Sequence, residues 1–377
     1  MLFNSPPLTE QDEQVIARIE RIRDALRHQL PDQRRWVGLL RRVMLARAIR
    51  GSNSIEGYNV SLDDAAAAIA GEEPLDAEDE AWMAVVGYRD AMTYVLQLAD
   101  DAHFTYDESL IRSLHYMMIG YALDKSPGRW RPGPVYVHDE STGDIVYTGP
   151  DAIDVPDLMH ELVEYLRNKD REHPLIRAAM AHLNLAMIHP FRDGNGRMAR
   201  CVQTMVLARE GIVASPFSSI EEYLGSNTES YYRVLVEVGQ GSWHPERDAK
   251  PWIKFVLTAH YRQAQVMLRR AEEAEHRWTV LEEVVARLRL PERVTAALFN
   301  GALGFRLRNA TYRELADVSE SIAGRDLKAL VRAGLLEPRG EHRARHYVAA
   351  PRLRAIDESV RQKRRPVEDP YDLPVPA

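Results

Sequence analysis

Residues 189–200 read HPFRDGNGRMAR, and this stretch decides how the centre of the chain is organised. Pro190 ends the apolar helical pattern before it, and Gly194 and Gly196 lie where the next helical pattern begins. Because glycine has no side chain, the backbone N–H groups at the start of the second helix can approach a ligand. A helix start of this kind binds anions. The stretch therefore predicts two helices joined by a loop that binds a negatively charged group.

The charged residues of this stretch suit a phosphate ligand. Arg197 and Arg200 are near the first turn of the second helix, where the helix dipole disfavours each positive charge by roughly 0.3–1 kcal/mol. Their spacing of three places them on one face, so a di- or triphosphate would satisfy both. Asp193 offers an oxygen ligand for phosphate-bound Mg²⁺, and His189 can accept a proton from an attacking hydroxyl near neutral pH.

Each of these residues also has an ordinary structural interpretation. A histidine before proline is typical of a helix end, Gly-Asn-Gly of a turn, and two arginines of a solvated helix face. Together, however, a base, a metal ligand, a glycine-flanked anion site and two arginines lie within twelve residues. That combination indicates phosphoryl chemistry.

The rest of the chain reads as mostly helical. Apolar residues three or four apart predict helices from residue 9 to 98, interrupted at 30–33, 51–60 and 71–80. A helix over 107–123 follows, and then a β-hairpin that pairs 135–137 with 145–147, the only sheet that we expect in the central region. Helices resume from residue 156 to about 275. The fold class is therefore mainly α.

From Trp278 the pattern predicts two short helices followed by a basic hairpin, the outline of a winged helix-turn-helix. The cations of the expected recognition helix and wing are Arg325, Lys328, Arg332, Arg339, Arg343 and Arg345. These side chains suit contacts to DNA phosphates. The alternative is a helical module for homodimer formation or target docking, with solvated arginines. Both interpretations remain open.

Composition sets wider limits. The 377 residues have a formal net charge of −7, which argues against general affinity for nucleic acid. Cys201 is the only cysteine, so it can form neither an intramolecular disulfide nor a cysteine-built zinc site. We see no apolar run of the roughly 20 residues that a membrane helix needs, and no secretory signal at the start. We expect a cytoplasmic protein without a membrane partner.

These patterns divide the chain into four parts. We expect an N-terminal helical region at 1–100, a central core at 101–275, a winged-helix-like domain at 276–356 and a flexible tail at 357–377. The tail contains too many prolines and charges to pack.

The run at 189–200 resembles the signature of Fic-domain proteins, HPFx(D/E)GNGRxxR, and matches it at every defined position. The resemblance covers roughly residues 35–265, and it implies a helical bundle with a β-hairpin flap before the motif. It also implies roles for the motif residues: His189 as the general base, Asp193 as the Mg²⁺ ligand, Gly194, Asn195 and Gly196 as the anion hole, Arg197 on the β-phosphate and Arg200 on the γ-phosphate.

The resemblance implies a protein adenylyltransferase, which moves AMP from ATP to a hydroxyl of a target protein. Gly196 favours this reaction, because a kinase-like branch of the family has lysine there and binds its nucleotide reversed. The target would add as a strand to the flap, for which Val135 and Val137 are candidates. Tyr231 and Tyr232 occur where relatives often have tyrosines near the adenosine, and a core role for one of them is an alternative.

Residues 52–57, SNSIEG, match the inhibitory pattern (S/T)xxxE(G/N) of the same family, with Ser52 and Glu56 at its defined positions. By this resemblance Glu56 pairs with Arg200 in a bidentate geometry and fills the space for the γ-phosphate. In some relatives the same glutamate could orient a water for removal of AMP, so the net direction stays open. A second class of function is a DNA-binding regulator whose Fic-like region senses nucleotide without catalysis.

Overall fold

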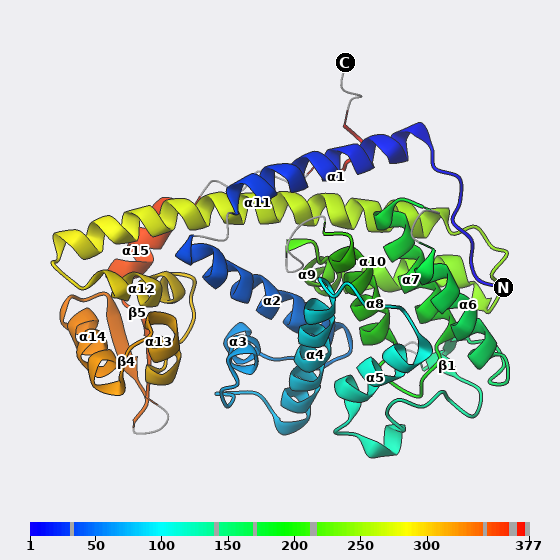
Figure 1. Cartoon of the computed structure of the whole chain (residues 1–377), viewed down its shortest axis with the longest axis horizontal. Helices are drawn as coiled ribbons and strands as arrows, with labels where there is room; N and C mark the ends of the chain where they lie inside the picture. Colours follow the sequence, from blue (N-terminus) through cyan, green and yellow to red (C-terminus); the bar gives the residue numbers. More distant parts are fainter. Residues whose placement is uncertain are drawn as a thin grey trace.

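The computed structural model describes residues 1–30, 34–138, 143–168, 172–211, 217–341, 345–361 and 368–373. These residues form an elongated, mainly helical molecule (Figure 1), which confirms the predicted fold class. The first four helices are α1 (Glu10–Gln29), α2 (Arg35–Ile55), α3 (Leu62–Ala70) and α4 (Asp79–Leu98). Side chains set two of the starts: Thr9 and Asp12 form a capping box at α1, and the Ser61 hydroxyl accepts the Asp64 N–H at α3.

The end of α2 differs from the prediction. The interruption expected at 51–60 begins only after Ile55, because residues 51–55 continue the helix. Glycine, serine and asparagine are poor helix formers. Here Gly51, Ser52 and Asn53 are all buried, so tertiary packing outweighs their low helix propensity. The correction places the end of α2 in the interior of the protein.

The central region packs around two helices. Its helices are α5 (Glu108–Ile119), α6 (Val155–Arg167), α7 (Pro174–Ile188), α8 (Asn195–Arg209), α9 (Glu221–Ser226) and α10 (Thr228–Gly239). Nearly all residues of α7 and α8 are buried. A helix buried on every side belongs to the core, and this pair carries residues 189–194 between its two helices.

The predicted hairpin is present as β1 (Tyr136–His138) and β2 (Ile145–Thr148), which pair antiparallel. Its tip at 139–142 lies outside the described residues. A third strand, β3 (Gly241–Ser242), pairs parallel with β2 and was not predicted. The strand order is β1-β2-β3, so β1 keeps one free edge. A two-residue strand shows no alternation of apolar residues that a sequence could reveal.

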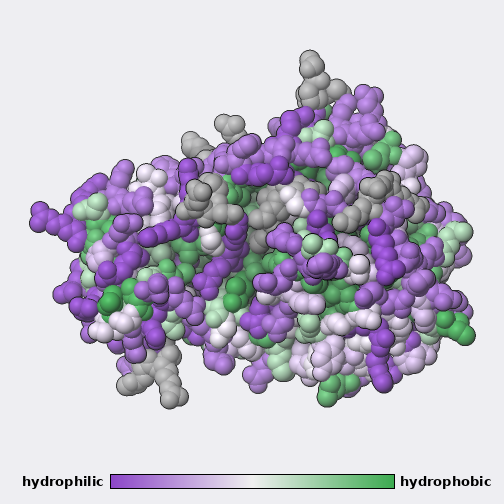
Figure 2. All heavy atoms as spheres, viewed as in Figure 1, coloured by the Kyte–Doolittle hydropathy of each residue, from purple (hydrophilic) through white to green (hydrophobic). Residues whose placement is uncertain are grey.

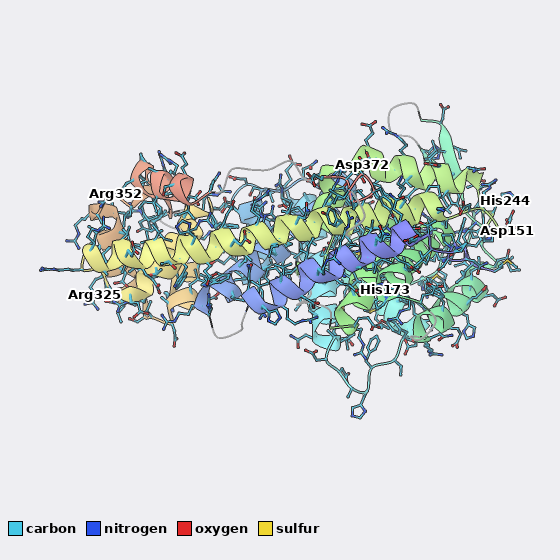
Figure 3. The ribbon with its side chains drawn as sticks, turned by 90° about the horizontal axis from the view of Figure 1, so that it is seen from above. Asp151, His173, His244, Arg325, Arg352 and Asp372 are labelled. Atoms are coloured by element: carbon cyan, nitrogen blue, oxygen red, sulfur yellow. The ribbon has the colours of Figure 1, made fainter. Side chains whose placement is uncertain are left out.

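The boundary expected near residue 275 falls inside one helix. Helix α11 runs without interruption over Lys250–Arg287, and α1 lies along it (Figures 1 and 3). No glycine or proline occurs between Pro251 and Pro291, so nothing in this stretch breaks the helix. The helix therefore joins the central region to the C-terminal part.

Beyond α11, a short 3₁₀ turn at Glu292–Val294 precedes the remaining elements: α12 (Thr295–Ala302), α13 (Asn309–Ala316), α14 (Glu320–Arg332), β4 (Leu336–Arg339), β5 (His346–Ala349) and α15 (Pro351–Val360). The expected pair of helices and hairpin is thus present, with β4 and β5 antiparallel. Their interpretation as a winged helix stays a prediction. One apolar cluster contains Phe299 and Leu330 together with Trp36 and Leu40 of α2, so this part shares its core with the N-terminal region.

The expected flexible tail differs from the structure at two places. Residues 357–360 belong to α15, and the buried Asp357 carboxylate pairs with Arg277 at 2.7 Å. Residues 368–373 lie against α1, where the Tyr371 hydroxyl donates to Asp12 at 2.8 Å and Arg18 donates to the Pro370 carbonyl at 3.3 Å. The sequence could not predict these contacts, because a segment rich in proline and charge has no periodic apolar pattern.

The surface is mostly hydrophilic. Figure 2 shows mainly polar residues on the visible face, with apolar residues scattered among them. Among the helices that the structure describes, none combines the length and apolar character required to cross a membrane.

Candidate functional site

The loop at 189–194 is shaped by left-handed backbone at both ends. His189 follows α7 with φ 52° and ψ 57°, and Gly194 precedes α8 with φ 75°. A left-handed conformation is uncommon for a residue with a β-carbon and is a reason to examine its role. The loop thus turns the chain between the end of α7 and the start of α8.

His189 is held as a neutral imidazole. Its Nδ1 lies 3.2 Å from the Ala186 carbonyl oxygen, and because a carbonyl only accepts, Nδ1 is the protonated nitrogen. This leaves Nε2 as a proton acceptor. Burial lowers the pKa of His189 below its usual value. A neutral histidine with a free Nε2 at pH 7 is suited to general base chemistry.

The interior of the loop is packed against aromatic and amide groups. Phe191 is fully buried, and its ring stacks on His115 with centroids 3.6 Å apart. The Asn195 side chain accepts from the Phe191 N–H at 2.9 Å and donates to the Phe191 carbonyl at 3.0 Å. The amide of Asn195 is therefore occupied within the loop. In an anion hole, this residue would contribute its main-chain N–H.

Two residues that the sequence analysis missed hold the loop from outside. His115 of α5 donates from Nε2 to the Asp193 carbonyl at 3.0 Å and accepts the Gly128 N–H on Nδ1 at 2.8 Å. Both bonds require the neutral ring, and burial lowers the pKa of His115 to about 4. Arg131 donates from Nε to the His189 carbonyl at 2.9 Å. Because these partners are main-chain carbonyls, no sequence motif marks either residue.

Arg197 is a buried cation in the first turn of α8. The side chain is 1% exposed, and its Nε and Nη1 have no hydrogen-bond partner among the described residues. The guanidinium lies 5.0 Å from the ring centroid of Tyr58, a cation–π contact. Buried polar groups normally have partners, and a buried charge without one is costly. Arg197 is thus placed to bind a negatively charged ligand at the start of α8.

Arg200 already has an internal partner. Its Nη2 donates to Glu56 Oε1 at 2.6 Å and to the Ser52 carbonyl at 2.9 Å, while Nε donates to the Ser52 hydroxyl at 2.7 Å. The structure therefore brings Ser52, Glu56 and Arg200 together. The bidentate geometry expected for the pair is wrong, because a single carboxylate oxygen contacts a single nitrogen. Arg200 divides its donors between Glu56 and Ser52, and its Nη1 has no partner among the described residues.

Gly196 touches the same carboxylate. A β-carbon built at this position would lie 2.3 Å from Glu56 Oε1 and 3.1 Å from Arg200 Nη1. The first distance is shorter than real Cβ contacts, so this arrangement of Glu56 requires glycine at 196. The carboxylate of Glu56 therefore occupies space directly over the start of α8.

Asp193 is a single candidate metal ligand. Its Oδ1 accepts the Gly194 N–H at 2.6 Å, and its Oδ2 lies 4.0 Å from Lys125 Nζ. The described residues contain no group of three or more histidine, cysteine or acidic side chains that could hold a metal ion. One carboxylate fits Mg²⁺ when phosphate oxygens and water supply the other ligands. The site therefore suits a metal that arrives with a polyphosphate.

The two tyrosine candidates have different environments. Tyr231 is 1% exposed, and its hydroxyl lies 2.9 Å from Nε2 of the buried His182. Its side chain therefore belongs to the core, which was the alternative interpretation. Tyr232 is 43% exposed and donates to the Ile55 carbonyl at 3.2 Å, next to Glu56. Of the two, only Tyr232 reaches the surface beside the site.

The flap candidates lie on the edge strand and just before it. Val137 of β1 pairs with Tyr147 of β2, whereas Val135 precedes β1 and its carbonyl accepts the Gly149 N–H at 3.3 Å. Both valines are half-buried. The free edge of β1 has the main-chain groups that strand addition requires.

Comparison with known proteins finds a family match within the central region. Residues 105–207 match the Fic/DOC family. The chain is 29% identical over 215 residues to "Protein adenylyltransferase Fic" from Nematostella vectensis, covering 54% of this chain and 44% of that protein. It is 26% identical over 268 residues to the protein of the same name from Aedes aegypti, covering 70% and 50%. The chain thus spans half or less of the length of these relatives.

Solved structures support the fold. A Fic family protein from Desulfovibrio desulfuricans superposes with a TM-score of 0.58 at 22% identity, over 92% of this chain and 98% of that one. A Fic-domain-containing signaling protein from Bacteroides thetaiotaomicron gives a TM-score of 0.53 at 21% identity, over 70% and 97%. At these identities, the similarity establishes the fold.

Proposed function

We propose that this chain, whose residues 105–207 match the Fic/DOC family, is a protein adenylyltransferase that transfers AMP from ATP to a hydroxyl side chain of a target protein. The observation that carries the proposal is the buried guanidinium of Arg197 at the start of α8, whose Nε and Nη1 have no hydrogen-bond partner among the described residues, in the same motif as the neutral His189. The names of the two relatives, "Protein adenylyltransferase Fic", agree with it.

The geometry suggests a role for each group. His189 Nε2 removes the proton from the target hydroxyl, whose oxygen attacks the α-phosphorus of ATP. The bond between this phosphorus and the bridging oxygen breaks, and pyrophosphate leaves. Arg197, the main-chain N–H groups at the start of α8 and, once freed, Arg200 stabilise the negative charge on the phosphates. Mg²⁺ held by Asp193 and the phosphates would neutralise part of this charge.

We propose that Glu56 keeps this site inactive by default. The carboxylate holds Arg200 and lies over Gly196, where phosphate oxygens must approach. ATP with an intact γ-phosphate would compete with Glu56 for the same guanidinium. The opposite use of the site, removal of AMP with Glu56 orienting a water, remains the alternative direction.

Labelling of cell lysate with ATP tests the activity. Wild type, Glu56→Gly and Glu56→Gly/His189→Ala are incubated with ATP labelled at the α- or γ-phosphate. We expect weak labelling by wild type, strong α-label transfer by Glu56→Gly, and none by the double variant. An exposed carboxylate in the neighbouring loop, changed as Glu73→Gly, is the matched control and should label like wild type. Transfer of γ-label would instead indicate a kinase, and no transfer by any variant would contradict adenylyl transfer.

A second function is supported by the cations of the C-terminal part. Arg325, Lys328 and Arg332 follow each other at spacings of three and four on α14, and all three are exposed. They form no ion pair with any residue that the structure describes, and Arg345 is likewise exposed without one. Arg343 lies outside the described residues. Figure 3 places Arg325 at the far end of the molecule from Asp151, which follows the flap.

We propose that this cationic face binds duplex DNA, while homodimer formation and target docking are the alternatives. The test uses the full chain and a fluorescent duplex at two salt concentrations. Binding that weakens with salt, and that Arg325→Ala/Lys328→Ala/Arg332→Ala reduces, supports phosphate contacts. If wild type does not bind the duplex at low salt, DNA binding is ruled out. Sedimentation of wild type and of the triple-alanine variant would then test dimerisation.

We also propose a cytoplasmic location, with which the buried, unpaired Cys201 agrees.

A further inference from the structure

Arg131 is a buried cation that bonds only to main-chain carbonyls. It is 3% exposed, and its side chain forms no ion pair with the described residues. Nε donates to the His189 carbonyl at 2.9 Å, and Nη1 donates to the Gly133 carbonyl at 2.6 Å. Nη2 donates to the Pro150 carbonyl at 2.6 Å and to the Ile188 carbonyl at 3.4 Å. One guanidinium therefore joins three separate segments of the chain.

The three segments have a functional relationship. Gly133 precedes the first strand of the flap and Pro150 follows the second, so the bonds of Arg131 fix both ends of the hairpin. The third segment carries His189, the candidate base. The Arg131 main-chain N–H adds a bond to the Pro190 carbonyl at 2.9 Å, which ties the same residue to the catalytic loop again.

Fixing these segments to one another has a chemical consequence. Suppose that a target hydroxyl is bound along the edge strand β1. Its distance from His189 Nε2 then depends on the position of the flap relative to the end of α7, which His189 directly follows. Charge-assisted hydrogen bonds from a planar guanidinium hold their partners at defined angles and distances. A lysine ammonium is a point charge and cannot reproduce this fork.

We propose that Arg131 is a positioning residue that sets the distance between the hydroxyl presented by the flap and the base His189. This inference rests on the proposed adenylyl transfer for its catalytic consequence, whereas the physical link between flap and loop can be measured without it. Arg131 touches neither nucleotide nor target in this account. Its effect therefore falls on transfer to the target and leaves nucleotide binding unchanged.

The catalytic test compares Arg131→Met and Arg131→Lys in the Glu56→Gly background. Arg129→Met is the matched control, because Arg129 lies two residues away and is exposed. The affinity for ATP is measured by calorimetry, and the labelling rate is followed over a dilution series of lysate to separate kcat from KM. We expect Arg131→Met to lower kcat for labelling by about 10- to 100-fold, as small misplacements of reacting groups do. Arg131→Lys should recover part of the rate, and ATP affinity and Arg129→Met should match the parent.

Hydrogen exchange in the otherwise wild-type chain provides a readout that needs no activity. In Arg131→Met, the Gly149 amide, which donates to Val135, and the amides pairing β1 with β2 should exchange faster, while those of α8 keep their protection. If Arg131→Met does not fold, both the labelling rate and the hydrogen exchange are measured on Arg131→Lys instead.

The outcomes separate the two hypotheses. If the Glu56→Gly parent labels nothing, adenylyl transfer is wrong, and faster exchange confined to the flap would still support the link through Arg131. If the parent labels and Arg131→Met loses ATP affinity in parallel with labelling, Arg131 supports the nucleotide loop in general and the positioning role is overturned. Unchanged labelling with unchanged exchange overturns it as well.

Discussion

At the scale of single residues, Gly196 connects the candidate active site with Glu56, the proposed inhibitory residue. The absence of a side chain lets phosphate oxygens approach the start of α8 in the proposed reaction. The same absence makes room for Glu56 Oε1, which would lie 2.3 Å from a β-carbon at this position. The lack of a β-carbon at position 196 is therefore required by both the proposed reaction and the proposed inhibition.

A double-mutant cycle tests this contact through stability. In wild type, Gly196→Ala should lower the free energy of unfolding by about 1 kcal/mol, because the β-carbon moves the flexible Glu56 carboxylate away from its hydrogen bond with Arg200. In Glu56→Gly the clash is gone, and alanine in a helix is favoured over glycine by about 0.5–1 kcal/mol, so the cost should vanish. Urea unfolding of the four proteins measures both values. An equal cost in both backgrounds would show that the two residues are not coupled.

Buried neutral histidines predict how stability depends on pH. Burial lowers the pKa of His115 to about 4 and that of His182 to about 3. In the unfolded chain a histidine titrates near pH 6.5. Between about pH 6.5 and 4 the unfolded state therefore binds protons that the native state excludes, so the free energy of unfolding falls as the pH falls.

The contribution of His115 can be isolated with His115→Gln. Glutamine can still accept the Gly128 N–H and donate to the Asp193 carbonyl, but it does not titrate. We expect the stability of this variant to fall less steeply than wild type between pH 6.5 and 4, by up to about 1.4 kcal/mol per pH unit. Denaturant unfolding at a series of pH values gives the slopes. Identical slopes would mean that His115 takes up its proton at the same pH in the native and unfolded states, which would contradict the lowered pKa.

The sequence predicted part of the site. Residues 189–200 were found because the chemistry of phosphates and a family pattern both mark them, whereas Glu56 was found from a family pattern alone. His115 and Arg131 were missed because each bonds to carbonyl oxygens, which every residue has. The environment of Tyr231 was decided by tertiary packing against His182, which lies 49 residues away.

At the scale of elements, the position of Glu56 depends on a close contact between α2 and α9. A β-carbon on Gly51 would lie 2.6 Å from the Glu221 carbonyl oxygen, and one on Gly225 would lie 2.6 Å from the Gly51 carbonyl oxygen. The two backbones therefore touch directly. Ser52 follows Gly51 directly and Glu56 follows about one turn later, so this contact fixes the end of α2 beside Glu56.

Two alanine substitutions in α2 test the contact. Gly51→Ala meets backbone atoms that cannot move cheaply, and it should lower the free energy of unfolding by about 1–3 kcal/mol. Gly38 belongs to the same helix and has no atom within 4 Å of a built β-carbon, so Gly38→Ala should stabilise the protein by about 0.5–1 kcal/mol. Urea unfolding compares the two. The contact is unimportant if both variants have the same stability.

Most helices followed from apolar periodicity, and the failures have a common physical cause. The end of α2 and the full length of α11 depend on packing and on the absence of a helix breaker, and neither changes the local pattern sharply. The strand β3 and the segment at 368–373 gain stability from distant partners. Periodicity reports only which face of a regular element is buried.

At the scale of the whole molecule, Arg306 fastens the C-terminal part to the N-terminal region. Its Nε lies 2.9 Å from Asp63 Oδ2, and its Nη2 lies 2.6 Å from Asp76 Oδ2. The Arg306 main-chain N–H also donates to Asp63 Oδ1 at 2.7 Å. These contacts hold the start of α3, where Asp63 is seven residues from Glu56 in the chain.

Removal of the Arg306 contacts with Asp63 and Asp76 should loosen the start of α3. Arg306→Ala is expected to lower the free energy of unfolding by about 1–2 kcal/mol and to speed hydrogen exchange over residues 56–75. The control is Arg313→Ala on α13, because Arg313 is exposed and forms no ion pair with described residues. Exchange that rises equally in both variants would show that Arg306 has no special part in holding α3.

The uninterrupted helix α11 also determines how this architecture can change by insertion or deletion. Each residue of an α-helix advances the chain by about 1.5 Å and turns it by about 100°. Adding or losing one residue between the two ends would therefore rotate the cationic face around the helix axis and remove Arg306 from its carboxylates. Lengths that differ by whole heptads nearly restore the angle. The distance along α11 between the candidate nucleotide site and the C-terminal part should therefore change in steps of about two turns, and relatives that keep the arrangement of the two parts should differ in α11 by whole heptads.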